Sequence, residues 1–74
     1  MGRRVMKTRY KFIHFKQTGE KFYLVFNNKS KCVLGKIEYF YQWRQYVFSA
    51  SPLAIFSASC LDDISDFIGQ LKGG

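Results

Sequence analysis

The chain has 74 residues, of which 47% are hydrophobic and 19% aromatic, and it carries a formal net charge of +7. The length suits one domain, the hydrophobic content excludes a disordered chain, and no apolar run reaches the roughly 18–20 residues of a membrane-spanning helix. We therefore expect a single basic globular domain.

The N-terminal part begins with a charged segment and continues into an aromatic one. Residues 1–8 are basic and lack hydrophobic periodicity, which predicts a flexible basic arm ahead of a domain at residues 9–72. No apolar signal-peptide core follows the charged start, so we expect a cytoplasmic protein. Residues 10–16 are rich in aromatic side chains and end at a Gln-Thr-Gly-Glu turn, which predicts a first strand.

Three more strands are expected, each separated from the next by a turn. Apolar residues alternate along residues 21–26 and again along residues 33–39. The polar segment 27–30 between them suits a hairpin loop, because Asn tolerates the left-handed backbone that such turns need. A turn at residues 41–43 then leads into a fourth strand at residues 44–49.

The alternation also predicts which side chains point toward a covering layer. Gly35 falls on the apolar face of the third strand and indicates a bulge or a close packing contact. Pro52 ends the fourth strand, and residues 53–56 are either a fifth strand at the sheet edge or a packed loop. The side chains expected to face the covering layer are Phe22, Leu24, Phe26, Val33, Ile37 and Tyr39. The side chains expected on the open face are Lys21, Tyr23, Lys36 and Glu38.

The C-terminal segment is the clearest helix. Ser59 suits its N-cap, and Asp62 and Asp63 would lie in its first turn, where they interact favourably with the helix dipole. Apolar residues recur at helical spacing through about residues 60–71. The side chains expected to pack on the sheet are Leu61, Ile64, Phe67, Ile68 and Leu71. The predicted fold class is therefore α+β, a four- to five-stranded antiparallel meander sheet with one C-terminal amphipathic helix packed on one face.

The sequence lacks the combinations of side chains that catalysis or metal binding requires. A catalytic nucleophile needs a base within hydrogen-bond reach, and His14 is the only histidine and cannot by itself complete a zinc site. Cys32 and Cys60 form no CxxC pair and, in a cytoplasmic protein, are expected to be reduced and structural. The glycines are scattered and form no phosphate-binding loop. We expect no enzyme activity, no cofactor and no metal site.

The distribution of charge favours an anionic partner. Residues 1–44 hold eleven Lys and Arg against two acidic residues, whereas residues 45–74 hold one Lys against three Asp. Basic and aromatic side chains on an open sheet face can contact phosphates and stack on bases. We therefore predict a small nucleic-acid-binding protein with no role in a membrane. The expected nucleic-acid-binding residues are Arg3, Arg4, Lys7, Arg9, Lys11, Lys21, Tyr23, Lys36, Trp43, Arg44 and Tyr46.

A protein-interaction role is the alternative. Exposed aromatic residues and free sheet edges suit protein interfaces equally well, since aromatic and Arg side chains are enriched there. The protein would then be an accessory module that docks to another protein or associates with itself. A continuous positive sheet face would favour nucleic acid, and scattered charge around an apolar patch would favour a protein partner.

The second half of the chain also carries a family resemblance. The pattern consists of Leu34-Gly35-x-Ile37, then Trp43-Arg44-Gln45-Tyr46-x-Phe48, then Cys60-Leu61-x-Asp63-Ile64-x-x-Phe67-Ile68. It resembles small proteins of bacteriophages and mobile elements that have no established activity. The resemblance covers about half of the chain and implies a short phage-type protein, but it transfers no functional residues.

Overall fold

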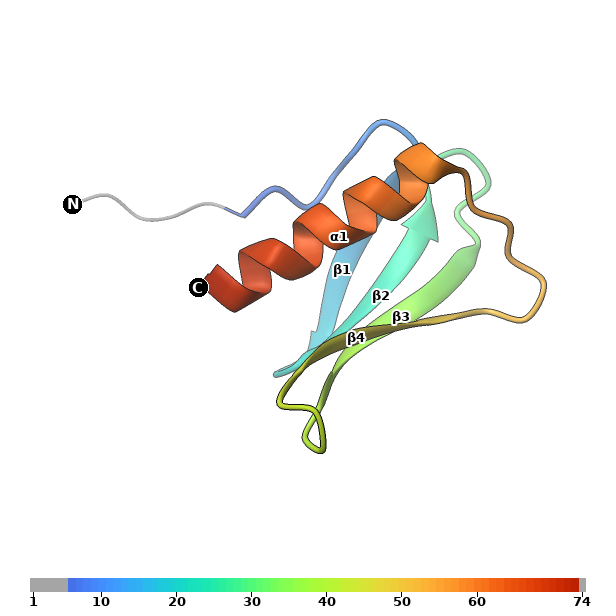
Figure 1. The fold of residues 1–74 in the computed structure, drawn as a ribbon. Helices are drawn as coiled ribbons and strands as arrows, with labels where there is room; N and C mark the ends of the chain where they lie inside the picture. Colours follow the sequence, from blue (N-terminus) through green and yellow to red (C-terminus); the bar gives the residue numbers. More distant parts are fainter. Residues whose placement is uncertain (1–5, 74) are drawn as a thin grey trace.

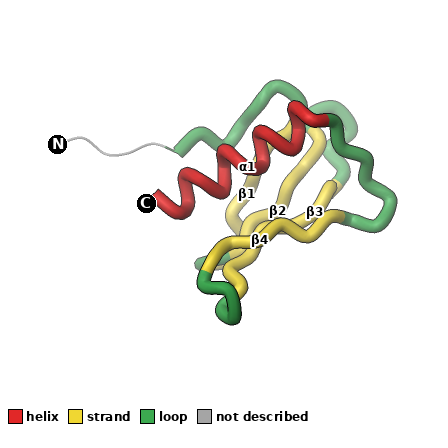
Figure 2. The backbone as a smooth tube through the Cα atoms, viewed as in Figure 1, coloured by secondary structure: helices red, strands yellow, loops and turns green. Residues whose placement is uncertain are grey.

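The computed structural model describes residues 6–73, and within them it shows one antiparallel sheet crossed on one face by one helix (Figure 1). Strands that follow one another in sequence also pair in the sheet, so the predicted α+β meander is confirmed. Residues 51–57 form a loop rather than a fifth strand (Figure 2). The elements are β1 (Ile13–Gly19), β2 (Phe22–Asn27), β3 (Val33–Phe40), β4 (Gln45–Ala50) and α1 (Ala58–Gly73).

The core lies between the sheet and α1. The ring of Phe67 on α1 stacks on the ring of Phe15 in β1, with centroids 4.0 Å apart, and meets the ring of Tyr23 in a T-shaped contact at 5.3 Å. Burial of such large apolar surfaces is the main favourable term in the folding of a domain of this size. The fully buried side chains are Ile13, Val25, Ile37 and Phe67.

The predicted orientation of β2 is wrong. Val25 is fully buried and Tyr23 packs on α1, so the odd-numbered residues of this strand face the helix. The prediction failed because both alternating sets of side chains in β2 are apolar or aromatic, so the alternation does not indicate which set is buried. The residues that were expected to face the helix but instead lie on the open face are Phe22, Leu24 and Phe26.

The register between β2 and β3 shifts next to Gly35. Val25 pairs with Gly35, but Phe26 pairs with Val33, which marks a β-bulge. The bulge places Val33 opposite Phe26, on the open face, contrary to its predicted orientation. Gly35 itself is required by packing: a Cβ there would lie 2.5 Å from the carbonyl oxygen of Ser49 and 2.7 Å from the ring of Phe48. The close packing contact predicted at Gly35 is confirmed.

The helix begins earlier than predicted. The Ser57 hydroxyl accepts a hydrogen bond from the backbone N–H of Cys60 at 3.2 Å, so Ser57 is the N-cap, whereas Ser59 lies inside the first turn. The two candidate caps are only two residues apart and have the same side chain, so local sequence alone does not separate them. Asp62 and Asp63 consequently lie beyond the first turn.

The packed face of α1 is rotated slightly from the predicted one. Ile64 and Phe67 are buried as expected, but Leu61 is 50% exposed. Cys60, which is half-buried, contacts the core in its place. Cys60 lies four residues before Ile64 and therefore on the same side of the helix, so its small apolar side chain completes the stripe.

The segment before β1 is tied to α1. The backbone N–H of Lys7 donates to the Gln70 side chain at 2.8 Å, and the Gln70 amide donates back to the Lys7 carbonyl at 2.9 Å. Met6 also packs against the core. Residues 6–8, which were predicted to belong to the flexible arm, are thus held by the domain, and the rest of the predicted arm lies outside the described residues.

A buried tyrosine strengthens this attachment. Tyr10 is 7% exposed, and its hydroxyl donates to a carboxylate oxygen of Asp66 at 2.7 Å. Burial, and then this hydrogen bond to a negative group, raise the pKa of Tyr10 to about 12, because both disfavour the phenolate. The Tyr10–Asp66 pair is a charge-assisted link between the segment before β1 and the exposed side of the helix.

Candidate nucleic-acid interface

The meander topology brings two turns to one end of the sheet. The β1–β2 turn and the β3–β4 turn share this end, and the β2–β3 loop lies at the other, because each strand reverses direction. Lys21 lies in the first turn and Arg44 in the second. Two predicted nucleic-acid-binding cations, 23 positions apart in sequence, are thereby placed at the same end of the molecule.

The β3–β4 turn has a defined backbone conformation. The backbone N–H of Trp43 donates to the Phe40 carbonyl at 3.1 Å, and that of Arg44 donates to the Tyr41 carbonyl at 3.3 Å. Arg44 was predicted to begin the fourth strand. It has φ of 55°, in the left-handed region, and belongs to the turn, because β4 begins at Gln45. The turn leaves Tyr41 71% exposed and Trp43 65% exposed.

A hollow lies between this end of the sheet and the end of α1. Its volume is about 370 Å³, and its described lining includes two cations and no acidic residue. We call it the tyrosine hollow. The described residues that line it are Tyr39, Arg44, Gln45, Tyr46, Leu71 and Lys72.

Lys21 adds a third cation beside the hollow. Its ammonium group lies 4.6 Å from the centroid of the Tyr39 ring and 5.4 Å from that of the Tyr41 ring. Tyr39 in turn contacts both Tyr41 and Tyr46 in T-shaped pairs, with centroids 4.9 Å and 5.2 Å apart. Cation–π attraction of this kind holds a lysine over an aromatic ring while leaving its charge available.

These observations define one candidate site, which we call the turn platform. It combines three cations from separate parts of the chain with four aromatic rings. Lys21, Trp43, Arg44 and Tyr46 were predicted from the sequence. The other three members were not, because Tyr39 was expected to face the covering layer, Tyr41 only to form the turn, and Lys72 only to end the helix. The turn platform consists of Lys21, Tyr39, Tyr41, Trp43, Arg44, Tyr46 and Lys72.

The other predicted site residues lie elsewhere. Tyr23 was predicted to lie on the open face, but it faces α1 and packs on Phe67. Burial raises its pKa above the usual value for tyrosine. Arg3 and Arg4 lie outside the described residues. The three basic residues of the segment before β1, which are exposed, are Lys7, Arg9 and Lys11.

The open sheet face is not the positive surface that was predicted. Lys36 does point to this face, but its ammonium group lies 3.6 Å from the carboxylate of Glu38, which offsets its charge. Lys36 also lies 5.7 Å from the ring centroid of Phe22. The apolar side chains that the register places on this face are Phe22, Leu24, Phe26, Val33, Phe40 and Val47.

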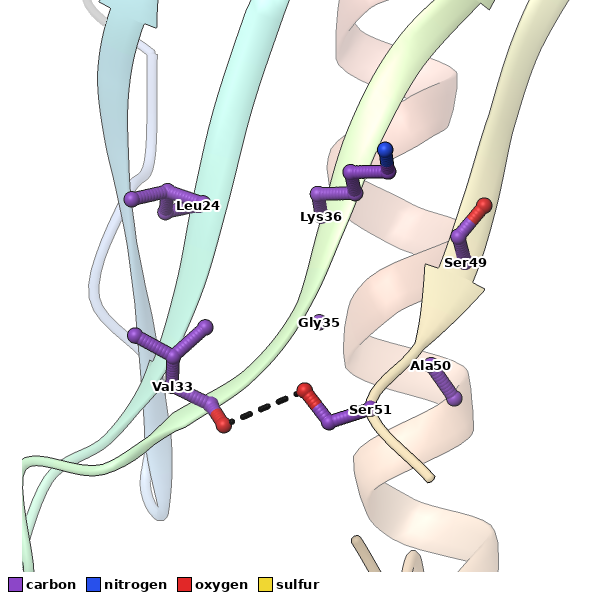
Figure 3. A pocket seen from close by; sticks show the side chains of 7 residues that line it. All are labelled: Leu24, Val33, Gly35, Lys36, Ser49, Ala50 and Ser51. Atoms are coloured by element: carbon purple, nitrogen blue, oxygen red, sulfur yellow. Dashed lines mark hydrogen bonds between the residues drawn. The ribbon is translucent and has the colours of Figure 1, made fainter. Parts of the chain in front are cut away.

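A shallow hollow of about 200 Å³ lies on this face, with α1 behind the sheet (Figure 3). Leu24 and Val33 line it on one side and Ser49 on the other, with Lys36 between them. The Ser51 hydroxyl closes its end by donating to the Val33 carbonyl at 3.3 Å. The face is therefore mainly apolar, with the Lys36–Glu38 pair among its apolar side chains, an arrangement closer to the one expected for a protein partner than to a continuous positive face.

No part of the described chain offers a membrane-spanning helix or a group of metal ligands. Within residues 6–73, α1 falls short of the length and apolar content needed to cross a bilayer. Among the same residues, no three His, Cys, Asp or Glu side chains cluster in a way that would hold a metal ion.

Comparison with known proteins adds no relative: no family model, curated protein or solved structure matches this chain. The resemblance to phage proteins stays a prediction. Function is therefore inferred from the geometry of the site alone.

Proposed function

We propose that this protein is a non-enzymatic nucleic-acid-binding domain that contacts phosphates through the turn platform. The observation that supports this most directly is the convergence of Lys21, Arg44 and Lys72 around the tyrosine hollow. The three cations come from a hairpin turn, a second turn and the end of a helix. Among the described residues that line the hollow there is no acidic side chain beside Arg44 and Lys72.

Phosphate binding suits the chemistry of the hollow. A phosphate group accepts hydrogen bonds from guanidinium, ammonium and phenol groups, and the hollow presents all three through Arg44, Lys72 and its tyrosines. The chain's net charge of +7 would add long-range attraction for a polyanion. Lys7, Arg9 and Lys11 contribute further charge on the segment before β1.

Titration of labelled oligonucleotides by fluorescence anisotropy at several salt concentrations tests the proposal. Each neutralised phosphate releases condensed counterions, so three contacts predict a log–log slope of about −2 for single strands and about −3 for duplexes. Binding that does not weaken with salt, or an absence of binding at about 50 mM salt, where surface electrostatics are strongest, would contradict the proposal.

The chain offers a matched pair of variants for this experiment. Arg44 and Lys31 are both cations at positive φ, 55° and 66°, but Lys31 lies in the β2–β3 loop at the far end of the sheet. Arg44→Gly and Lys31→Gly therefore remove the same charge from the same backbone conformation. We expect Arg44→Gly to weaken binding about three- to tenfold and to reduce the salt slope by about 1, and Lys31→Gly to change either quantity little.

A second candidate function is supported by the open sheet face. Leu24 lies between Lys16 and Lys36 in the register of the sheet, within an apolar surface that α1 does not cover. Uncovered apolar surface of this kind often marks a protein interface. A second copy of the chain would bring lysines against lysines, so a partner with an acidic rim fits better.

Sedimentation and crosslinking distinguish this second function from the first. On the protein-partner hypothesis the chain alone sediments as a monomer, and Leu24→Glu abolishes crosslinking to the partner while Arg44→Gly does not. Loss of crosslinking in Arg44→Gly alone would place the partner on the turn platform and contradict the hypothesis.

A further inference from the structure

We infer that the turn platform selects single-stranded nucleic acid, whose unpaired bases stack on Trp43 and Tyr41 while Arg44 binds the phosphate between them. The inference rests on the proposed function and specifies its ligand. Three features of the β3–β4 turn support it: two exposed rings, the contacts that hold these rings in position, and the cation Arg44, which directly follows Trp43.

The two rings of the turn are the most exposed aromatic side chains of the described residues, at 71% for Tyr41 and 65% for Trp43. Phe15 and Tyr23, by contrast, pack against Phe67 in the core. Removing the apolar surface of a ring from water is favourable, and stacking on a base buries part of that surface.

Each exposed ring is positioned by a neighbour that leaves it accessible. Trp43 meets Phe40 at 4.9 Å with an interplanar angle of 73°, and Tyr41 meets Tyr39 at 4.9 Å and 74°. A T-shaped contact uses the edge of one ring and one face of the other, so each exposed ring keeps at least one face outside that contact. Such positioning reduces the entropy that stacking would otherwise cost.

Trp43 and Tyr41 also extend to different sides of the sheet. Trp43 lines a shallow hollow with Glu38, Phe40 and Val47, whose alternation places them on the open face. Tyr41 contacts Tyr39, which lines the tyrosine hollow beside α1. A flexible single strand can pass around the end of the sheet and reach both rings, whereas a stiff duplex cannot.

Base pairing gives a second reason for this selectivity. In a duplex the base faces are already stacked on one another, and only their edges are open in the grooves. Rings that protrude from a turn can stack only on bases that are unpaired. A duplex would therefore contact the cations of the turn platform but gain nothing from Trp43 or Tyr41.

The test compares a single strand of about 12 nucleotides, which exceeds the site size of most small single-strand-binding folds, with a duplex of the same sequence. Trp43 is the only tryptophan of the chain, so its fluorescence reports stacking directly. We expect the single strand to bind about tenfold more tightly than the duplex and to quench this fluorescence, and we expect the duplex to leave it unchanged. DNA and RNA single strands form separate arms.

Ring-deletion variants separate stacking from charge. Trp43→Ala, followed by anisotropy of the labelled oligonucleotide, should reduce single-strand affinity to about the duplex value without altering the salt slope. Phe12→Ala is the matched control, because Phe12 is 48% exposed but lies just before β1, at the other end of the sheet. Circular dichroism of both variants confirms that the fold is kept.

The outcomes distinguish this inference from the proposed function. Equal affinity for single strand and duplex with no quenching would overturn the inference and leave phosphate binding standing. An equal loss of affinity in Trp43→Ala and Phe12→Ala would also overturn it. No binding of either ligand at low salt would overturn the inference together with the proposed function.

Discussion

The two ends of the sheet differ in composition although both carry exposed basic residues. The turn platform combines Lys21 and Arg44 with aromatic rings that contact one another. The other end, at the β2–β3 loop and the loop before α1, exposes lysines, the single ring of Phe12 with the Lys11 ammonium group 5.3 Å from its centroid, and aliphatic side chains such as Leu53 at 95% and Ile55 at 92%. Positive charge alone therefore does not define a site here; the aromatic cluster beside it does.

The backbone sharpens this comparison. Each end contains one non-glycine residue in the left-handed region, Arg44 at one and Lys31 at the other. In both places the residue with positive φ lies in the connection between two strands, so a left-handed backbone does not by itself indicate a ligand-binding residue. What differs is the surroundings, because Arg44 lines a hollow with two tyrosines and Lys31 lies in a polar loop.

The largest expected effect concerns the contact at the centre of α1 that holds the helix on the sheet. Phe67→Ala removes a fully buried ring from between Phe15 and Tyr23 and should lower the free energy of unfolding by about 3–5 kcal/mol. Leu61→Ala, at the exposed start of the same helix, should cost well under half of that. Urea unfolding measures both, and equal losses would show that the start of α1 packs as firmly as its centre.

A smaller loss is expected where the sheet approaches itself most closely. Gly35→Ala would place a methyl group 2.5 Å from the Ser49 carbonyl oxygen, so β3 and β4 must move apart. Overpacking of this kind should lower the free energy of unfolding by about 1–3 kcal/mol. The control is Gly69→Ala, because a Cβ there meets nothing within 4 Å. Comparable thermal midpoints for the two variants would rule out the close contact.

The two glycine variants of the turns should gain stability by similar amounts. A left-handed backbone costs a non-glycine residue roughly 1–2 kcal/mol, and glycine returns part of this as chain entropy in the unfolded state. Arg44→Gly and Lys31→Gly should therefore each raise the free energy of unfolding by about 0.5–1 kcal/mol. A clear loss of stability in Arg44→Gly would mean that the arginine side chain stabilises the turn and is not free to bind phosphate.

Alkaline pH should weaken the attachment of the N-terminal segment. The pKa of Tyr10 is about 12 in the fold against an ordinary value of 10.0, so its contribution is complete below pH 10 and is lost as the pH rises toward 12. The thermal midpoint should fall over this range, and less steeply in Tyr10→Phe. Because lysines titrate in the same range, the difference between the two proteins is the relevant quantity, and parallel curves would contradict the assignment.

The smallest expected effect is chemical. Cys32 and Cys60 are both free thiols, but Cys32 is exposed at the loop end and Cys60 is half-buried against the core. A thiol reagent should modify Cys32 first in the folded protein and both at equal rates after unfolding. Simultaneous modification in the native state would mean that the first turn of α1 opens readily.

Much of the fold follows from local patterns in the sequence. The helical spacing of Ile64, Phe67, Ile68 and Leu71 predicted α1 and most of its packed face, and the polar segment at 27–30 predicted the β2–β3 connection. These predictions succeeded because a single repeating preference dominates each segment. The predicted N-cap, Ser59, was wrong by two residues, since Ser57 and Ser59 are equally good caps by sequence.

The sequence did not determine which face of β2 is buried or where the candidate site lies. Phe22, Leu24 and Phe26 alternate as convincingly as Tyr23 and Val25, so only the pairing with β1 and β3 and the position of Phe67 decided the face. The burial of Tyr23 removed one predicted site residue and left the open face apolar.

The grouping of the turn platform is likewise a tertiary result. Lys21, Arg44 and Lys72 are far apart in sequence, and each alone is an ordinary surface cation. The sequence determined the charge and the elements because these depend on neighbours along the chain. Only the packing of α1 across a four-stranded meander brought Arg44 and Lys72 to one hollow with Lys21 beside it, because that depends on contacts between segments that no local pattern encodes.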